Sequence, residues 1–148
     1  MKYLLDTNAC IALINDKAPA VRTRLQKALA QDAKVLVSSV VAFELWYGVA
    51  KSARPEANAR LVETFFAGPV SLLAFEPEDA KVAGQVRAAL EGAGKPIGAY
   101  DLLIAAQALR HQLTVITANA REFSRVKGLE WEDWAKRLNR PPAGHAKS

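Results

Sequence analysis

The sequence predicts an α/β fold whose central, mainly parallel sheet of four to five strands is flanked by helices. Short aliphatic and β-branched runs alternate with longer segments of helical periodicity, in the order β-α-α-β-α-α-β-α-α-β. The 148 residues have the length of one domain. A hydrophobic fraction of 51% is ample for a single core.

The helices can be located from their periodicity and from the residues that begin them. An apolar run at residues 3–5 stops at Asp6, and a helical segment follows at once. Pro19 suits the first turn of the second helix. Ser38 or Ser39 is placed to cap the third. The predicted helices are residues 9–14, 20–31, 40–50, 59–67, 77–91 and 99–112.

Turn-forming residues and β-rich runs define the strands. A turn is predicted at residues 52–58, which contain Pro55, and the chain breaks again at residues 68–69 and 92–96. The predicted strands are residues 3–5, 34–38, 70–75 and 113–117, with a short edge strand within residues 126–131.

We expect residues 1–138 to form one domain and residues 139–148, with their Pro141-Pro142 pair, to be a flexible tail. No signal peptide and no apolar run of membrane-spanning length is recognisable, so we expect a cytoplasmic protein that does not bind membranes. The single Cys10 excludes an intrachain disulfide. The net charge of +5 permits contact with a polyanion but does not establish it.

Three carboxylates occupy informative positions, although each also has an ordinary explanation. Asp6 ends the first strand, where an aspartate is also a favoured helix cap. Glu44 stands in an almost wholly apolar helix; it could lie on a narrow exposed stripe, but the first basic residue after it is Lys51, too far for a local ion pair. Asp101 lies in the first turn of another apolar helix, where the helix dipole favours an acid.

The predicted topology brings these side chains to one edge of the sheet. Parallel strands point the same way, so Asp6 and Asn119, which follow the first and fourth strands, emerge at the same edge. A crossover helix runs antiparallel to the strand it feeds, so the start of the Asp101 helix lies there too. The start of the Glu44 helix shares that edge, and three carboxylates and one amide can therefore converge.

Clustered carboxylates repel one another unless a hard cation neutralises them, and carboxylate oxygen suits Mg²⁺ or Mn²⁺. The sequence has no His/Cys set for zinc and no glycine-rich phosphate loop. A cation held by acids in a basic protein points to phosphodiester hydrolysis, in which the metal activates water and stabilises the leaving oxygen.

Four segments, in order along the chain, resemble the motifs of PIN-domain ribonucleases, most closely those of VapC-type toxins from bacterial type II toxin–antitoxin pairs. The resemblance extends from residue 1 to about residue 134. It implies a PIN-like three-layer fold and an Mg²⁺-dependent endoribonuclease. The segments are residues 4–8 (LLDTN), 38–48 (SSVVAFELWYG), 100–108 (YDLLIAAQA) and 117–123 (TANAREF).

The resemblance also implies residue roles. Asp6, Glu44 and Asp101 would be the acidic ligands of Mg²⁺ or Mn²⁺, and together with Asn119 they form the predicted catalytic set. Thr7 and Thr117 would contact or support the metal–water network.

Two residues of the last motif bear on the charge of this site. Many relatives carry a fourth acid where this chain has Asn119, and an amide adds no negative charge. Glu122 is a candidate to replace that charge, although a solvated acid paired with Arg121 or Arg125 is the simpler interpretation.

The resemblance implies partners as well: an RNA substrate, a second copy of the chain in a homodimer, and a VapB-like antitoxin that also mediates any contact with operator DNA. The antitoxin would lie in an apolar groove near the helix hairpin and could push an arginine toward the acids. Candidates to line the groove are Trp46, Tyr47, Phe65 and Phe66. We expect most of the large apolar side chains of the hairpin, Phe43 among them, to be core, and leave Trp46 and Tyr47 open.

Two alternatives remain open at this point. Because of Asn119, the chain could be a weakly catalytic or non-catalytic PIN module that acts mainly in an antitoxin–DNA regulatory complex. A phosphatase with an aspartyl nucleophile is less favoured, because that chemistry commonly uses a second aspartate where this chain has Asn8.

Overall fold

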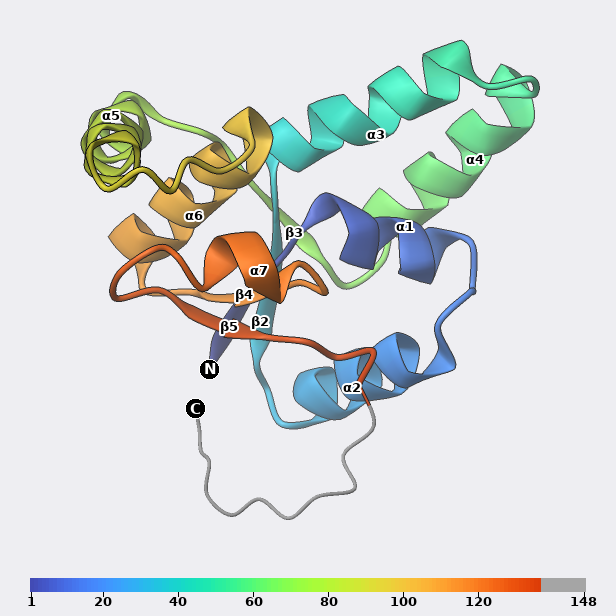
Figure 1. Cartoon of the computed structure of the whole chain (residues 1–148). Coiled ribbons are helices and arrows are strands. Elements are labelled where there is room, and N and C mark those ends of the chain that lie inside the picture. Colours follow the sequence, from blue (N-terminus) through green and yellow to red (C-terminus); the bar gives the residue numbers. More distant parts are fainter. Residues whose placement is uncertain (137–148) are drawn as a thin grey trace.

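The computed structural model describes residues 1–136 and shows one central sheet with helices on both faces (Figure 1). Its strands are β1 (Lys2–Leu5), β2 (Lys34–Ser38), β3 (Ser71–Leu73), β4 (Thr114–Ile116) and β5 (Glu130–Glu132). They lie in the order β3-β2-β1-β4-β5, and every neighbouring pair is parallel. The predicted α/β class and the short edge strand are therefore confirmed.

The helices lie in two layers. They are α1 (Thr7–Ile14), α2 (Pro19–Ala30), α3 (Ser39–Lys51), α4 (Pro55–Phe66), α5 (Pro77–Gly92), α6 (Ala99–His111) and α7 (Ala120–Phe123). The chain moves in one direction from β1 through β2 to β3 and returns in the other to β4 and β5. Right-handed crossovers therefore place α1 to α4 on one face and α5 to α7 on the other, as Figure 1 shows for α1, α2 and α4 against α5 and α6.

The hydrophobic core is centred on the middle strands and on α6. The side chains of Leu4, Leu5, Val37 and Val115 are inaccessible to solvent, as is Ile104 of α6. Strands that are buried on both faces of a sheet have continuous aliphatic sequences, and the middle strands of this sheet have such sequences. This core fixes the carboxyl edge of the sheet, where the predicted acids emerge.

One prediction of local structure was wrong, and one short helix was missed. The segment 52–58 was expected to be a turn, but α4 already begins at Pro55, which occupies its first turn. Proline is well suited there because its missing N–H has no partner in a helix start anyway. The short helix α7 was not predicted, since four residues are too few to show periodicity.

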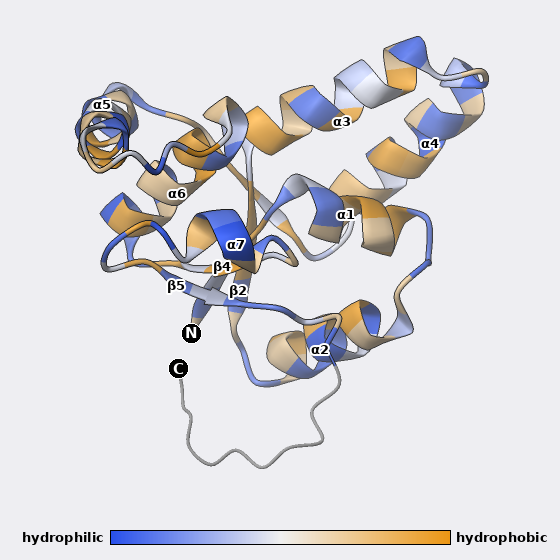
Figure 2. Ribbon diagram, in the orientation of Figure 1, coloured by the Kyte–Doolittle hydropathy of each residue, from blue (hydrophilic) through white to orange (hydrophobic). Residues whose placement is uncertain are grey.

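Helix α3 is also less buried than its apolar sequence suggested. Figure 2 shows hydrophobic residues along much of it, yet only Val41 and Leu45 are buried. The side chains of Phe43 and Tyr47 are 53% and 57% exposed, so the expected core position of Phe43 was wrong. The helix projects beyond the sheet with α4, and only its inner stripe meets other elements.

Some expectations cannot be placed on this fold. The boundary predicted at residue 138 and the predicted tail, residues 139–148, lie outside the described residues. Within residues 1–136, the structure contains no helix with both the length and the hydropathy needed to span a bilayer.

Candidate active site at the carboxyl edge of the sheet

Asp6 is held rigidly where β1 becomes α1. Its backbone N–H donates to the carbonyl of Ile116 at 3.1 Å, which continues the β1–β4 ladder. Its Oδ1 accepts from the N–H of Ala9 at 2.8 Å, so the side chain caps α1. The residue is only 4% exposed. Asp6 is thus both a helix cap and a buried acid at the sheet edge.

Glu44 is brought to the first motif by a contact between helices. The Thr7 hydroxyl, in the first turn of α1, donates to Oε1 of the half-buried Glu44 on α3. Thr7 therefore orients the carboxylate of Glu44. The contact joins two residues that are 37 positions apart in the chain.

Asp101 and Asn119 meet directly. The amide Nδ2 of Asn119 donates to Oδ2 of Asp101 at 3.1 Å. The backbone N–H of Asn119 donates to the hydroxyl of buried Thr117 at 2.8 Å, and its Oδ1 accepts from the N–H of Glu122 at 3.4 Å, which caps α7. Asn119 is therefore a donor that orients an acid.

Glu122 is linked to Asp101 and to the start of α6, while the charge of Arg125 also lowers its pKa, as the simpler interpretation of its sequence context had expected. Its Oε1 accepts from the N–H of Gly98, the residue that precedes α6, at 3.0 Å. This hydrogen bond is the main cause that lowers the pKa of Glu122, and Asp101 lowers it further by hydrogen bonding. Among the described residues no ion pair joins Glu122 to Arg121 or Arg125. Glu122 instead adds a second carboxylate beside Asp101.

The charges of these acids act on one another. Burial raises the pKa of Asp6, and the charges of Glu44 and Asp133 raise it further, while hydrogen bonds from Thr117 and Ala9 lower it. Burial and then Glu122 raise the pKa of Asp101 to about 7, with a smaller contribution from Asp6. The carboxylates from β1, α3 and α6 therefore converge electrostatically at one edge.

Asp133 was missed by the sequence analysis. The register pairs Leu5 with Ile116 and Ile116 with Glu132, so the next residues of the three strands, Asp6, Thr117 and Asp133, follow one another along the sheet edge. The N–H of Thr117 also donates to the carbonyl of Glu132 at 2.9 Å. The edge strand was predicted to end by residue 131, whereas β5 ends at Glu132, so Asp133 directly follows the observed strand and not the predicted one.

The donor set fits a hard divalent cation. Every side chain of the group offers oxygen, and among residues 1–136 no ion pair joins a lysine or arginine to Asp6, Glu44 or Asp101. Their ligand atoms do not all lie within 4.8 Å of one another. Mutual repulsion between carboxylates that lack a counter-charge opposes such close approach, and a cation between them removes that repulsion.

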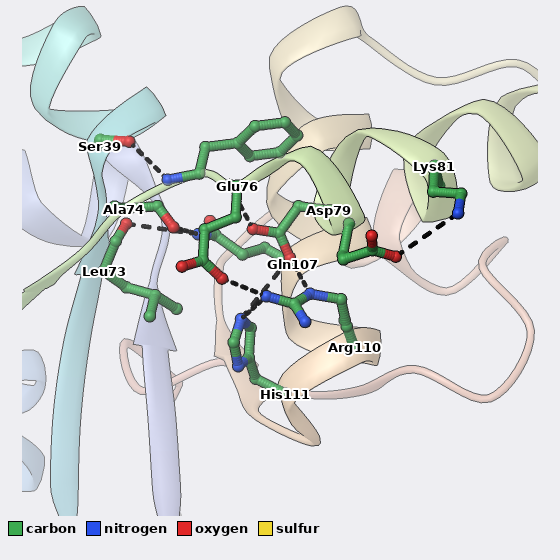
Figure 3. Close-up of polar contacts among 11 residues, drawn as sticks. Ser39, Leu73, Ala74, Glu76, Asp79, Lys81, Gln107, Arg110 and His111 are labelled. Atoms are coloured by element: carbon green, nitrogen blue, oxygen red, sulfur yellow. Dashed lines mark hydrogen bonds and ion pairs between the residues drawn. The ribbon is translucent and has the colours of Figure 1, made fainter.

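A second acidic cluster has closer spacing, but it already holds a cation. In the described part of the chain, ligand atoms of Glu76, Asp79 and His111 lie within 4.8 Å of one another. Figure 3 shows the guanidinium of Arg110 among them, with its Nε 2.6 Å from Oδ1 of Asp79. The arginine neutralises these acids, so we interpret this cluster as structural.

Two neighbouring grooves lie along α1, and the smaller one reaches Glu44. A groove of about 200 Å³ is lined by Glu44, Leu45, Ile14 and Leu61 among others, and Ile14 and Leu61 also line a neighbouring apolar groove of about 350 Å³. The larger groove lies between α1, α2 and α4, and Phe65 contributes to it. The larger groove and the groove that reaches Glu44 therefore lie side by side, with Ile14 and Leu61 lining both.

Together, these features define an α/β domain with a cluster of acidic side chains at the carboxyl edge of a parallel sheet. Comparison with known proteins agrees with this class. The PIN domain family model matches residues 3–129. The chain belongs to the PIN domain family.

Within that family the chain is similar to VapC proteins. It is 40% identical over 135 residues to the Shigella flexneri protein named tRNA(fMet)-specific endonuclease VapC, covering 91% of this chain and 99% of that protein. It is also similar to the VapC component of two solved complexes. For DNA-bound VapBC from Salmonella typhimurium, the TM-score is 0.83 at 39% identity, covering 90% of this chain and 98% of that one. For VapBC2 from Rickettsia felis bound to a promoter DNA fragment, the TM-score is 0.85 at 34% identity, covering 90% and 99%.

Proposed function

We propose that this protein is a divalent-cation-dependent endoribonuclease of the VapC type, a toxin held inactive by a cognate antitoxin. The observation that carries the proposal is the convergence of Asp6, Glu44 and Asp101 at one sheet edge without a compensating basic side chain among the described residues. The names of the VapC relatives support ribonuclease activity.

Asp6, Glu44 and Asp101 would hold Mg²⁺ or Mn²⁺. A bound divalent cation supplies Lewis-acid stabilisation of charge on phosphate oxygens and a lowered pKa for water. Thr7 orients Glu44, and Asn119 orients Asp101. These contacts fix the ligand oxygens before the cation binds, as hydrogen bonds to metal ligands commonly do.

Glu122 affects whether a site with Asn119 in place of a fourth acid binds a cation tightly enough for catalysis. The alternative of a non-catalytic module rests on an amide in place of a fourth acid. Glu122 returns a negative charge to the neighbourhood of Asp101, where it acts on the pKa of that residue. The catalytic function is therefore favoured over the alternative.

The substrate class is RNA, and initiator tRNA is the first candidate. The relative from Shigella flexneri, 40% identical over nearly its whole length, carries the name of an endonuclease specific for tRNA(fMet). Elongator tRNA(Met) is the natural comparison substrate, because it shares the anticodon and differs in the rest of the molecule.

The antitoxin would occupy the apolar groove between α1, α2 and α4 and extend to Glu44 along α1. Of the four aromatic residues expected to line such a groove, Phe65 does so, whereas Trp46, Tyr47 and Phe66 line neither groove. Both structural relatives named above are VapBC complexes bound to DNA, which supports a VapB-like partner through which operator DNA is contacted.

We also propose a homodimer that uses an exposed aromatic face formed by Phe43 and Tyr47 of α3 and Tyr100 of α6. The Phe43 ring lies 6.5 Å from Tyr47 and 5.8 Å from Tyr100, and Tyr100 is 44% exposed. A fully buried aromatic side chain covers about 150–250 Å², and about half of each of these three is exposed, so together they offer roughly 200–400 Å² of the roughly 800 Å² per partner of a stable interface.

Expression without the antitoxin tests the toxin function in cells. We expect growth arrest accompanied by new RNA 5′ ends at a small number of sites, found by sequencing RNA ends after induction. The Asp6→Asn variant should grow normally and leave no such ends, whereas the matched surface variant Asp32→Asn should behave like the unaltered protein. Arrest with the same RNA ends in Asp6→Asn would contradict the proposal.

A further inference from the structure

The segment between β3 and α5 is fixed by side chains from two helices that both carry predicted metal ligands. We define the linker as residues 73–79, which include the last residue of β3 and the first turn of α5. The Ser39 hydroxyl, at the start of α3, accepts from the N–H of Phe75 at 2.9 Å. Nε2 of Gln107 on α6 donates to the carbonyls of Leu73 at 3.3 Å and Ala74 at 3.0 Å. Figure 3 shows these contacts converging on the linker.

Arg110, one helical turn after Gln107, holds the far end of the linker. Its Nε donates to Oδ1 of Asp79 at 2.6 Å, and its Nη2 donates to Oε1 of Glu76. Asp79 is 0% exposed, and its Oδ2 accepts from the N–H of Glu76 at 2.7 Å. The guanidinium fork thus bridges two acids that are already joined in the capping box of α5.

These polar contacts add to the apolar packing of α6. The large buried side chains, Leu102 and Ile104, lie in its first half, whereas Ala105, Ala106 and Ala108 follow them and offer few knobs to prevent sliding along the helix axis. Gln107 is fully buried, and among the described residues its Oε1 has no hydrogen-bond partner. An unpaired buried oxygen costs free energy. The hydrogen bonds of the Gln107 amide to the linker can form at only one position of α6 along its axis, so the amide fixes that position.

The linker therefore connects the two helices that present the metal ligands. Glu44 follows Ser39 on α3 by five residues, and Asp101 precedes Gln107 on α6 by six. At about 1.5 Å of rise per residue these spans are roughly 7.5 and 9 Å of helix. If α3 or α6 shifted along its axis relative to the linker, the carboxylate that the helix carries would move by about the same distance.

We propose that Gln107 and Arg110 are positioning residues that, through the linker, fix α6 relative to α3 and so set the separation of Asp101 and Glu44 that a divalent cation requires. This rests on the proposed function of the carboxyl-edge site, but it concerns residues that do not touch that site. Loss of either side chain should weaken metal binding and slow catalysis without altering RNA binding.

The test compares metal affinity in matched variants of the full chain purified without its partner. The variants are Gln107→Met and Arg110→Met, with Arg110→Lys as the milder change that keeps the charge. Gln85→Met and Arg87→Met are the matched controls, because both lie on α5 and Arg87 also pairs with a carboxylate, Glu91. Leu25→Ala, which truncates a buried side chain of α2, controls for a general loss of stability.

Calorimetric titration with Mn²⁺ and steady-state cleavage of an RNA oligonucleotide supply the readouts. We expect Gln107→Met and Arg110→Met to bind Mn²⁺ about tenfold more weakly, the low end of the effect of residues that orient metal ligands. The kcat should fall and KM should stay unchanged. Arg110→Lys should lie between Arg110→Met and the unaltered chain. Gln85→Met and Arg87→Met should keep full affinity for Mn²⁺. Leu25→Ala should also keep it at temperatures below its melting temperature.

Unchanged Mn²⁺ affinity in both variants, with only a lower melting temperature, would overturn the inference and leave the linker contacts structural. Equal loss of affinity in Leu25→Ala would overturn it as well. Failure of the unaltered chain to bind Mn²⁺ would instead contradict the proposed function itself, so the two failures can be told apart.

Discussion

The side-chain amide of Asn119 donates a hydrogen bond to Oδ2 of Asp101 across 3.1 Å. An amide thus orients this carboxylate at the position where a second acid beside Asp101 was expected from the resemblance. The donor lowers the pKa of Asp101, whereas burial and Glu122 raise it. The balance between these neighbours decides how readily Asp101 is ionised to accept a cation.

Replacing Asn119 by alanine should weaken the site. Asp101 would lose its donor and its fixed orientation, and we expect about tenfold weaker Mn²⁺ binding with a similar loss of kcat. Asn119→Asp should have the opposite effect on affinity, because it adds a charge, while it destabilises the metal-free protein. Calorimetry and urea denaturation in EDTA measure the two effects. Tighter binding by Asn119→Ala would contradict the assigned role.

Glu122→Gln tests whether the second carboxylate contributes charge. Glutamine keeps an oxygen that can accept from the N–H of Gly98, so the local structure should remain. Loss of the charge should lower the pKa of Asp101 and raise the Mg²⁺ concentration needed for half-maximal cleavage. Glu63→Gln, on the exposed side of α4, is the control. An unchanged Mg²⁺ requirement would show that Glu122 only caps α6.

The raised pKa of Asp101 predicts how stability depends on pH without metal. The folded value is about 7 and the model-peptide value is 3.8, so the folded state binds more protons across that interval. The free energy of unfolding should therefore fall as pH rises from about 4 to 7. Asp101 is half exposed, and after allowance for solvent screening we expect a contribution of about 1 kcal/mol.

Urea denaturation in EDTA at pH 5 and pH 8 measures this contribution. Asp101→Asn should lose less stability than the unaltered chain between the two pH values. Saturating Mn²⁺ should stabilise the unaltered chain more at pH 8, since the cation binds the ionised carboxylate. An equal pH dependence in both proteins would contradict the electrostatic description of the site.

Tyr47→Ser and Phe43→Ser should each shift the protein toward monomer, because they remove apolar area from the aromatic face. Sedimentation velocity of the partner-free chain over a concentration series gives the association constant. Leu61→Ser is the control, since Leu61 lies in the groove assigned to the antitoxin. That control should keep the dimer and weaken antitoxin binding. Unchanged self-association in both aromatic variants would place the dimer interface elsewhere.

The sequence sufficed for the sheet and for the convergence of three acids, because both follow from strand order and from the direction of crossover helices. Asp6 stands at a strand–helix junction that is visible in the sequence, and Glu44 and Asp101 each interrupt an apolar helix. These signals are local, and topology then brings them together.

The missed features depend on contacts or on exposure that no local pattern encodes. Glu122 accepts from Gly98, 24 residues earlier, and its neighbours in sequence gave no sign of this bond. Asp133 follows an edge strand of three residues, too short to show alternation. Pro55 breaks a helix or begins one depending on its position. The exposure of Phe43 follows from how far α3 extends beyond the sheet.

Cleavage of initiator tRNA by the purified, partner-free chain is the decisive assay of the proposed nuclease activity. We predict cleavage at one or a few positions in Mg²⁺ or Mn²⁺, none in EDTA, and a loss of at least about a hundredfold in Asp6→Asn, because one ligand charge is removed from the site. Asp32→Asn should cleave at the normal rate. Cleavage in EDTA, or cleavage by Asp6→Asn at the rate of the unaltered chain, would contradict the account.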